Sequence, residues 1–355
     1  MSEEDVLHAY FDPSLGDGAG SSASSWATKN NSISLIETDD LLESANKLQQ
    51  GEGDLLVCSA EWAISNPSHG LTVLGALPRK EPTMILVSED KMEYLPKGAI
   101  ISTDIELCRR QLIRARPDLV IVKSENIQSE NSQFEDSGGD VARTIWLEER
   151  RQEGIIDGFV TNRSLFDAAK IKSRRHTLGL QRGESGRQRF LPPPWQGFTL
   201  LMGRSGANIQ RKKWESIISD LDHPAFLAFN LESRILRGIG DDILPYIGIH
   251  ACLRQIGTVL RELNEEEDLQ LIDELTDAYG KPRSTKPRAE LMIELLNGDG
   301  SVSISVERIS PEEEAMEAAV RLLQTFEDLL EIATMEHEYS PRLGDARPPM
   351  MKLDE

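Results

Sequence analysis

The pattern of hydrophobic and polar positions predicts alternating helices and strands from residue 38 onward. Residues 38–53 place apolar side chains at helical spacing behind a Thr38 cap and end at glycine, which indicates a helix. Short apolar runs predict strands at 54–59, 71–77, 83–88, 98–103 and 119–123, together with helices at about 104–116 and 143–153. Strands that alternate with helices favour an α/β fold with a mostly parallel sheet.

The same layout continues beyond an acidic, glycine-rich loop at 128–140. A strand is expected at 155–161, a helix at 163–171, and a further strand after the proline run of LPPPWQGFTLLMGR. Nearer the N-terminus, residues 12–25 are DPSLGDGAGSSASS and predict a loop. A phosphate-binding cradle is the alternative for that loop, but the stretch has no Lys and no flanking strand pattern.

The last third of the chain predicts a small α/β domain of its own. Residues 288–309 form two apolar runs around an Asn-Gly-Asp-Gly turn, which is a hairpin pattern. Residues 310–333 carry an apolar stripe at helical spacing, with Ser310 as the cap and Pro311 at the first helical position. Two segments complete the region, an amphipathic helix within 264–280 and a Pro-rich, disordered tail at 336–355.

Composition is typical of a globular protein from a reducing compartment. The 355 residues suit two or three domains, and no apolar run approaches the roughly 20 residues that span a bilayer. The first residues, MSEEDVLHAYFD, lack the basic start and apolar core of a signal peptide, so we expect a cytoplasmic protein. Three cysteines without metal-like spacing cannot form a disulfide framework, which agrees with that location.

The net charge of −21 argues against nucleic acid or an acidic membrane as a partner, because both repel such a field. The charge is uneven, since the basic stretch 170–213 holds eleven Lys or Arg and one acid, Glu184. This stretch is either a basic arm for a polycarboxylate or phosphate ligand or a mobile, solvated loop.

Several stretches, taken in order, resemble one enzyme family. Residues 53–82 (GDLLVCSAEWAISNPSHGLTVLGALPRKEP) and 95–119 (LPKGAIISTDIELCRRQLIRARPDL) align without gaps to porphobilinogen deaminase, also called hydroxymethylbilane synthase. Residues 191–204 (LPPPWQGFTLLMGR) resemble its LPAPGQGALAIECR strand, and residues 223–248 (HPAFLAFNLESRILRGIGDDILPYIG) match a further stretch in length. The similarity runs from about residue 38 to 333, and the chain resembles a divergent member of the family.

The resemblance implies an α/β protein of three domains. Two lobes with mixed sheets would resemble periplasmic binding proteins, and a small C-terminal α/β domain would follow. In this numbering the expected boundaries are 1–88 plus 197–220 for domain 1, 97–190 for domain 2 and 223–335 for domain 3, with crossings near 88–97 and 190–197 and the tail at 336–355.

Members of this family are transferases of tetrapyrrole, or heme, biosynthesis. They join four porphobilinogen units on a dipyrromethane cofactor that is attached to a cysteine. The chemistry needs a thiolate to anchor the cofactor, a carboxylate to stabilise the pyrrole cations, and arginines to hold acetate and propionate groups.

The anchor and the acid are missing at the aligned positions. Ile243 stands in place of the cysteine, and a hydrocarbon cannot form a thioether; Asp241 and Asp242 replace two glycines and would repel a polycarboxylate. Trp62 stands in place of the aspartate and cannot carry a negative charge. The neighbouring Glu61 would point to the opposite face of an extended chain, so we do not expect it to replace the acid.

The arginine sites are altered as well. Residues 104–108 hold none of the family's paired serines and arginines, and Asp104 would repel a carboxylate. Arg109 and Arg110 lie two places later, which rotates them by about 200° on a helix, away from the ligand. Four candidate substrate-binding residues remain, namely Ser59, Thr103, Arg109 and Arg110.

Three further expectations come from the comparison with the family. The N-terminal segment looks too short for the family's first strand, helix and strand. Residues 243–260 would form a helix capped by aspartate. Cys58 would lie near the expected cleft, and Cys252 would lie in the third domain, nine residues past Ile243; a small buried cysteine is the ordinary explanation for both.

The sequence therefore favours a porphobilinogen deaminase-like protein with weak or no deaminase activity, for which no cofactor is expected. One alternative is an active hydroxymethylbilane synthase with relocated site residues, which would carry dipyrromethane. The other is a non-catalytic two-lobe binding module for a small-molecule carboxylate or a tetrapyrrole, in which the basic stretch 170–213 would be the place to look.

Overall fold

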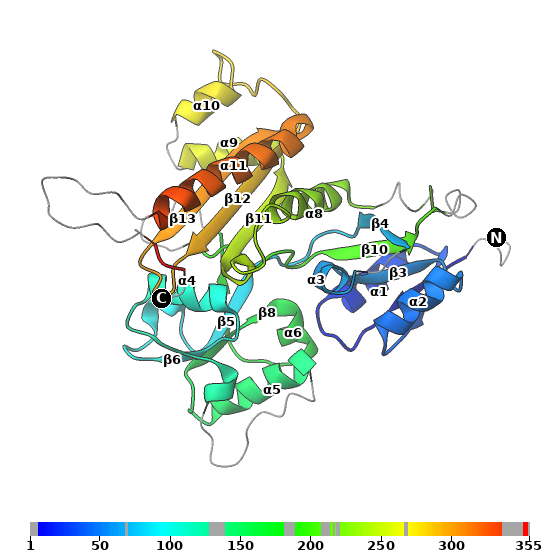
Figure 1. The fold of residues 1–355 in the computed structure, drawn as a ribbon, viewed down its shortest axis with the longest axis horizontal. Coiled ribbons are helices and arrows are strands. Elements are labelled where there is room, and N and C mark those ends of the chain that lie inside the picture. Colours follow the sequence, from blue (N-terminus) through cyan, green and yellow to red (C-terminus); the bar gives the residue numbers. More distant parts are fainter. Residues whose placement is uncertain are drawn as a thin grey trace, which may run out of the picture.

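The computed structural model shows an α/β protein with two sheet-containing lobes and a smaller C-terminal domain (Figure 1). It describes residues 6–67, 70–127, 139–180, 189–206, 214–215, 217, 221–265, 269–335 and 351–353. The fold class expected from the sequence is confirmed. Within the described ranges, no helix has both the length and the apolar character needed to cross a bilayer.

The first lobe is a five-stranded sheet with helices packed on it. Its strands are β1 (Leu7–Phe11), β2 (Ile33–Glu37), β3 (Leu55–Ser59), β4 (Leu71–Ala76) and β10 (Thr199–Arg204), and its helices are α1 (Ala19–Lys29), α2 (Leu41–Gln50) and α3 (Ala60–Ser65). The strand order is β2-β1-β3-β10-β4. The returning strand β10 pairs antiparallel with β3 and β4, so the sheet is mixed and not mostly parallel.

The strand, helix and strand at the N-terminus are present, which corrects the expectation that this segment is too short. Residues 19–29 form α1, although 12–25 was expected to be a loop. The helix carries few apolar residues, and it is held by the burial of Ala23 and Trp26. Its exposed hydroxyls donate to carbonyls one turn earlier, which satisfies them but does not stabilise the helix. A Cβ on Gly20 would lie 2.9 Å from the Cα of Pro13, so this close approach requires glycine.

The second lobe has a second five-stranded mixed sheet, in the order β7-β6-β8-β5-β9. Its elements are β5 (Met84–Ser88), β6 (Ile100–Ser102), α4 (Glu106–Ala115), β7 (Val120–Val122), α5 (Gly139–Gln152), β8 (Gly158–Asn162), α6 (Arg163–Ala168) and β9 (Arg175–Leu178), with 3₁₀ turns η2 (Met92–Tyr94) and η3 (Ser124–Asn126). Strand β5 belongs to this sheet, so the chain leaves the first lobe before residue 84. The expected crossing near 88–97, and the placement of 84–88 in domain 1, are wrong.

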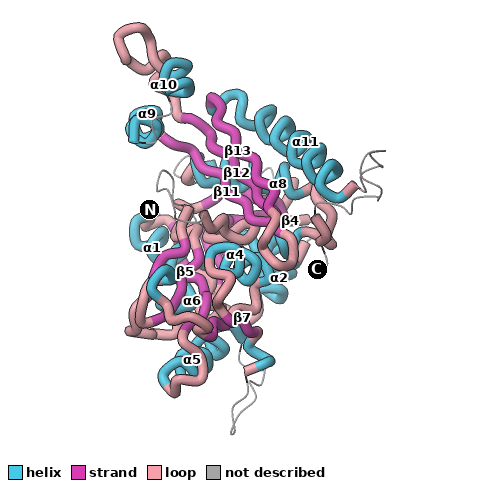
Figure 2. Tube along the Cα trace, turned by 90° about the vertical axis from the view of Figure 1, so that its left-hand side faces the viewer, coloured by secondary structure: helices cyan, strands magenta, loops and turns pink. Residues whose placement is uncertain are grey.

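The third domain is a three-stranded antiparallel sheet covered on one face by two long helices (Figure 2). Its elements are α8 (His223–Leu236), η5 (Leu244–Tyr246), β11 (Ile247–Arg254), α9 (Ile256–Glu265), α10 (Leu269–Leu275), β12 (Arg288–Leu296), β13 (Ser303–Pro311), η6 (Glu312–Glu314) and α11 (Ala315–Thr334). The expected hairpin is confirmed as β12 and β13. The expected helix at 243–260 is wrong, because β11 pairs with β12 along its whole length.

Two boundaries at the C-terminus also differ from expectation. The last helix begins at Ala315, because Ser310 and Pro311 still lie opposite β12 in the hairpin and so do not cap a helix. Met351 is buried and its N–H donates to the Ala333 carbonyl, so part of the tail is packed. The remaining tail residues, 336–350 and 354–355, lie outside the described ranges.

A buried ion pair connects the third domain to both chain crossings. Glu232 on α8 is fully buried and accepts from Arg79 Nη1 at 2.8 Å and from the N–H groups of Ala251 and Trp195 at 3.0 and 3.1 Å. Arg79 also donates to the Gln196 carbonyl at 2.9 Å. Four chain segments therefore meet at one carboxylate.

We predict that Glu232→Gln destabilises the protein by about 3–5 kcal/mol, because it leaves the Arg79 charge buried without a counter-ion. Urea unfolding followed by circular dichroism measures the loss. The matched control is Glu313→Gln, whose ion pair with Lys286 is more than half exposed and is worth at most about 1 kcal/mol. Equal effects of the two substitutions would contradict the prediction.

Candidate functional site

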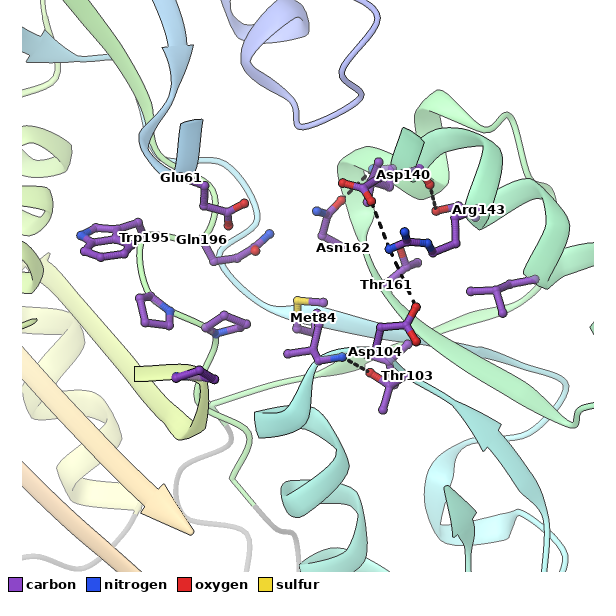
Figure 3. A pocket seen from close by; sticks show the side chains of 18 of the residues that line it. Glu61, Met84, Thr103, Asp104, Asp140, Arg143, Thr161, Asn162, Trp195 and Gln196 are labelled. Atoms are coloured by element: carbon purple, nitrogen blue, oxygen red, sulfur yellow. Dashed lines mark hydrogen bonds and ion pairs between the residues drawn. The ribbon is translucent and has the colours of Figure 1, made fainter. Parts of the chain in front are cut away.

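A cavity of about 460 Å³ lies between the two lobes, close to the third domain. Figure 3 shows its two walls. One wall consists of α3 and the second crossing, with Glu61, Trp195 and Gln196; the other consists of β6, α5 and β8, with Asp104 and Arg143 among others. Leu244 and Pro245 from η5 complete the lining.

Helix α3 determines which side chains of the SAEW motif reach the cavity. Ser59 caps this helix, and its hydroxyl accepts from the N–H of Trp62 at 3.2 Å and hydrogen-bonds to Asp17. Trp62 packs against the apolar cluster of the first lobe and is not part of the cavity lining. Glu61 lines the cavity, which corrects the expectation that it points away, because the segment is helical and not extended.

Glu61 is the most perturbed acid of this site. Its side chain stays accessible to water, but the cleft removes much of its hydration and the carboxylates of Asp17 and Asp140 lie nearby. Loss of hydration, with the repulsion from these two acids, raises the pKa of Glu61 to about 7. A carboxyl group with this pKa exchanges a proton near neutral pH.

Thr103 and Asp104 lie where β6 ends. Thr103 is buried and lines the cavity, and its hydroxyl accepts from the N–H of Ile105 at 3.3 Å. Asp104 also lines the cavity but does not cap α4, which begins at Glu106. Its carboxylate accepts from the N–H and the hydroxyl of Ser124 at 2.8 and 2.7 Å.

The charged groups of the cavity are mostly acids. Of the described lining residues, Glu61, Asp104 and Asp140 carry carboxyl groups and Arg143 carries the one guanidinium. Arg143 Nη1 lies 3.9 Å from Asp104 Oδ2 and 3.5 Å from Asp140 Oδ1. The single cation is thus paired with two of the acids, and an incoming carboxylate would have to compete with both.

Arg109 and Arg110 lie outside this cavity and face the third domain. Arg109 pairs with Glu106 and donates to the Gly298 carbonyl at 2.8 Å. Arg110 is buried, donates to the carbonyls of Leu296 and Leu353, and stacks over the Tyr246 ring at 3.7 Å. Both were candidates for substrate binding, but they hold α4 against the third domain.

The structure offers no fit for a dipyrromethane cofactor. Ile243 is buried directly before Leu244, which lines the cavity, so the expected anchor position is near the cleft but holds no sulfur. Burial raises the pKa of the Cys108 and Cys252 thiols to about 12, and that of Cys58 further still. Cys58 is fully buried beside Met202. None of these thiols is suited to act as a nucleophile.

A second cavity, of about 360 Å³, lies beside the glycine-rich segment that was considered as a phosphate cradle. The fold brings Lys80 and Arg163 to it from distant parts of the chain. However, Asp17 accepts from the first helical N–H of α1 at 2.9 Å, and Arg163 pairs with Glu81 at 2.7 Å. Much of the basic stretch 170–213, including 181–188 and 207–213, lies outside the described residues.

The lining residues that were not predicted from the sequence include Asp140, Arg143, Thr161 and Gln196. Asp140 and Arg143 face the cavity only because α5 packs on the second sheet, which no local pattern shows. Gln196 could have been identified as a site residue from the sequence, because the PWQG segment resembles the family's PGQG. Among the described residues no group of three or more His, Cys, Asp or Glu is arranged to hold a metal ion.

The raised pKa of Glu61 predicts a pH-dependent stability. Its pKa in the folded protein, about 7, is above the ordinary value of 4.5, so this group disfavours folding progressively as pH rises from about 5 to 7.5. Glu61→Gln removes this unfavourable ionisation, so the melting temperature of the variant should rise relative to that of the wild type between about pH 5 and 7.5. Glu327→Gln, an exposed change on α11, is the control; parallel curves for all three proteins would sink the prediction.

Comparisons with known proteins support a distant relationship with porphobilinogen deaminase. No family model matches the chain. A porphobilinogen deaminase from Thermus thermophilus is 25% identical over 223 residues, which are 62% of this chain and 65%, just under two thirds, of the relative. One similar solved structure is a periplasmic substrate-binding protein of an ABC transporter from Coxiella burnetii, which is 14% identical, covers 62% of this chain and 94% of its own, and has a TM-score of 0.35. Another is the aliphatic sulphonate binding protein SsuA from Escherichia coli, which is 14% identical, covers 92% of this chain and 86% of its own, and has a TM-score of 0.31.

Proposed function

We propose that this chain is a non-catalytic, two-lobe binding protein that shares its scaffold with porphobilinogen deaminase and takes a small molecule between its lobes. The observation that carries the proposal is the charge of the inter-lobe cavity, where three carboxyl groups surround one guanidinium that is already paired. Polymerisation of porphobilinogen brings many acetate and propionate groups into one cleft. A net acidic lining repels them.

The positions of the residues that replace the family's reactive groups support the same proposal. Trp62 is turned into the first lobe, and Ile243 provides no sulfur at the edge of the cavity. Arg109 and Arg110 are engaged by the third domain. The volume of the cavity, about 460 Å³, is within the range of small-molecule sites.

A second candidate function is deaminase activity with relocated residues, and Glu61 is the observation that favours it. A carboxyl group in the cleft with a pKa of about 7 is suited to general acid–base work. This candidate still needs a covalent anchor, and the three cysteines are poor nucleophiles. It therefore stays second.

The proposal predicts that recombinant protein carries no dipyrromethane, does not colour with Ehrlich's reagent, and neither consumes porphobilinogen nor releases a bilane. Intact-mass spectrometry should give the mass of the unmodified polypeptide. A stricter test of the proposal uses the Ile243→Cys variant, which provides a thiol at the anchor position. Because the acidic cleft still repels carboxylates, this variant should also stay unmodified after incubation with porphobilinogen. A melting curve checks that the variant is folded. A mass increase in either protein, or turnover of porphobilinogen, would contradict the proposal.

A further inference from the structure

The inter-lobe cavity has acids on both walls. Glu61 projects from α3 on the first lobe, whereas Asp104 and Asp140 lie on the second lobe (Figure 3). Only one cation is present among the described lining residues, and it lies between the two acids of the second wall. A ligand that enters between the walls therefore meets an uncompensated negative potential.

Two neutral polar side chains of this cavity have no hydrogen-bond partner among the described residues. Gln196 is 7% exposed and Thr161 is 6% exposed, and both line the cavity. Figure 3 shows the Gln196 side chain extending beside Glu61 into the space between the walls. The polar atoms of these two side chains are not sealed from water, so they face the open space of the cavity, where water or a ligand can hydrogen-bond to them. This observation is independent of the acids.

The lining also has an apolar part. Met84, Leu147, Val160 and Leu165 come from the second lobe, and two prolines and Trp195 come from the crossing. Of the described lining residues only Trp195 is aromatic, and its indole N–H donates to Ser233 outside the cavity at 3.2 Å. A quaternary ammonium group needs an aromatic cage, which is not formed here. A primary ammonium group needs hydrogen-bond acceptors, which are present on both walls.

We propose that this cavity binds a small primary amine with an apolar body and no carboxylate, with its ammonium group between Glu61 and Asp140, the acid of the second wall whose charge acts on Glu61, and with Gln196 as a neutral hydrogen-bond partner. The inference rests on the proposed binding function and adds the chemical class of the ligand. An ammonium group that contacts acids on both walls draws the lobes together, as in hinge closure around a ligand.

Isothermal titration calorimetry of the full chain at pH 8 tests the ligand class. At this pH Glu61 is ionised and an alkylamine, whose pKa is near the ~10.4 of lysine, is still protonated. The probes are phenethylamine and butylamine, with 3-phenylpropionate and phenylalanine as partners that add a carboxylate. We expect at least one amine to bind at a 1:1 ratio, and the two carboxylates to bind on the order of tenfold more weakly or not at all.

Substitutions locate the binding at the proposed residues. Glu61→Gln and Asp140→Asn should each weaken amine binding on the order of tenfold, since each removes a charge-assisted hydrogen bond. Gln196→Leu should weaken it several-fold. Glu327→Gln, far from the cavity on α11, should leave the affinity unchanged.

The outcomes separate this inference from the function on which it rests. Lack of binding by both amines, or tighter binding of 3-phenylpropionate, overturns the amine class, and in the second case the two-lobe binding function stands. Unchanged amine affinity in both acid variants overturns the proposed site. A dipyrromethane adduct overturns the binding function, whatever the amines do.

Discussion

The buried pair of Arg79 and Glu232 is the interaction on which the arrangement of the domains depends. Arg79 lies on the first crossing, and its guanidinium stacks over the Phe198 ring at 3.8 Å while it donates to Glu232, Gln196 and Ala251. Glu232 in turn accepts from the second crossing and from β11. A buried charge is tolerated only when it is paired and hydrogen-bonded, so these segments must stay in register. The cavity wall formed by Trp195 and Gln196 is fixed by the same contacts.

Both partners of this pair lie in stretches that resemble porphobilinogen deaminase in sequence. Arg79 lies in the 53–82 stretch and Glu232 in the 223–248 stretch. The departures, Trp62 and Ile243 among them, lie in or beside the cavity. Residues at a buried ionic junction cannot change singly without leaving a charge unpaired, whereas residues of a solvent-filled cleft can. A similar scaffold with a different cleft is therefore physically consistent with the proposed non-catalytic function.

Much of the fold could be predicted from local patterns, and most of the site could not. The hairpin of β12 and β13 and the helix α2 follow from turn residues and apolar spacing that act over short distances. Helix α1 was missed because its stability comes from packing Ala23 and Trp26 against the sheet. The predicted direction of the Glu61 side chain was wrong, because it depended on whether the residues of α3 were helical or extended. Asp140 and Gln196 line the same cavity only through the packing of the two lobes, which a sequence pattern does not record.

Arginines hold both lobes against the third domain. Arg114 on α4 pairs at 2.5 Å with the buried Glu294 of β12, next to the contacts that Arg109 and Arg110 make with the same domain. Arg79 joins the first lobe to that domain. A guanidinium that is held by the protein's own carboxylates and carbonyls has few donors left for a ligand. Both lobes are thus docked on the third domain by arginines, while the space between the lobes keeps its acids. These arginines are therefore engaged by the protein itself, and among the described lining residues of the cavity Arg143 is the one cation.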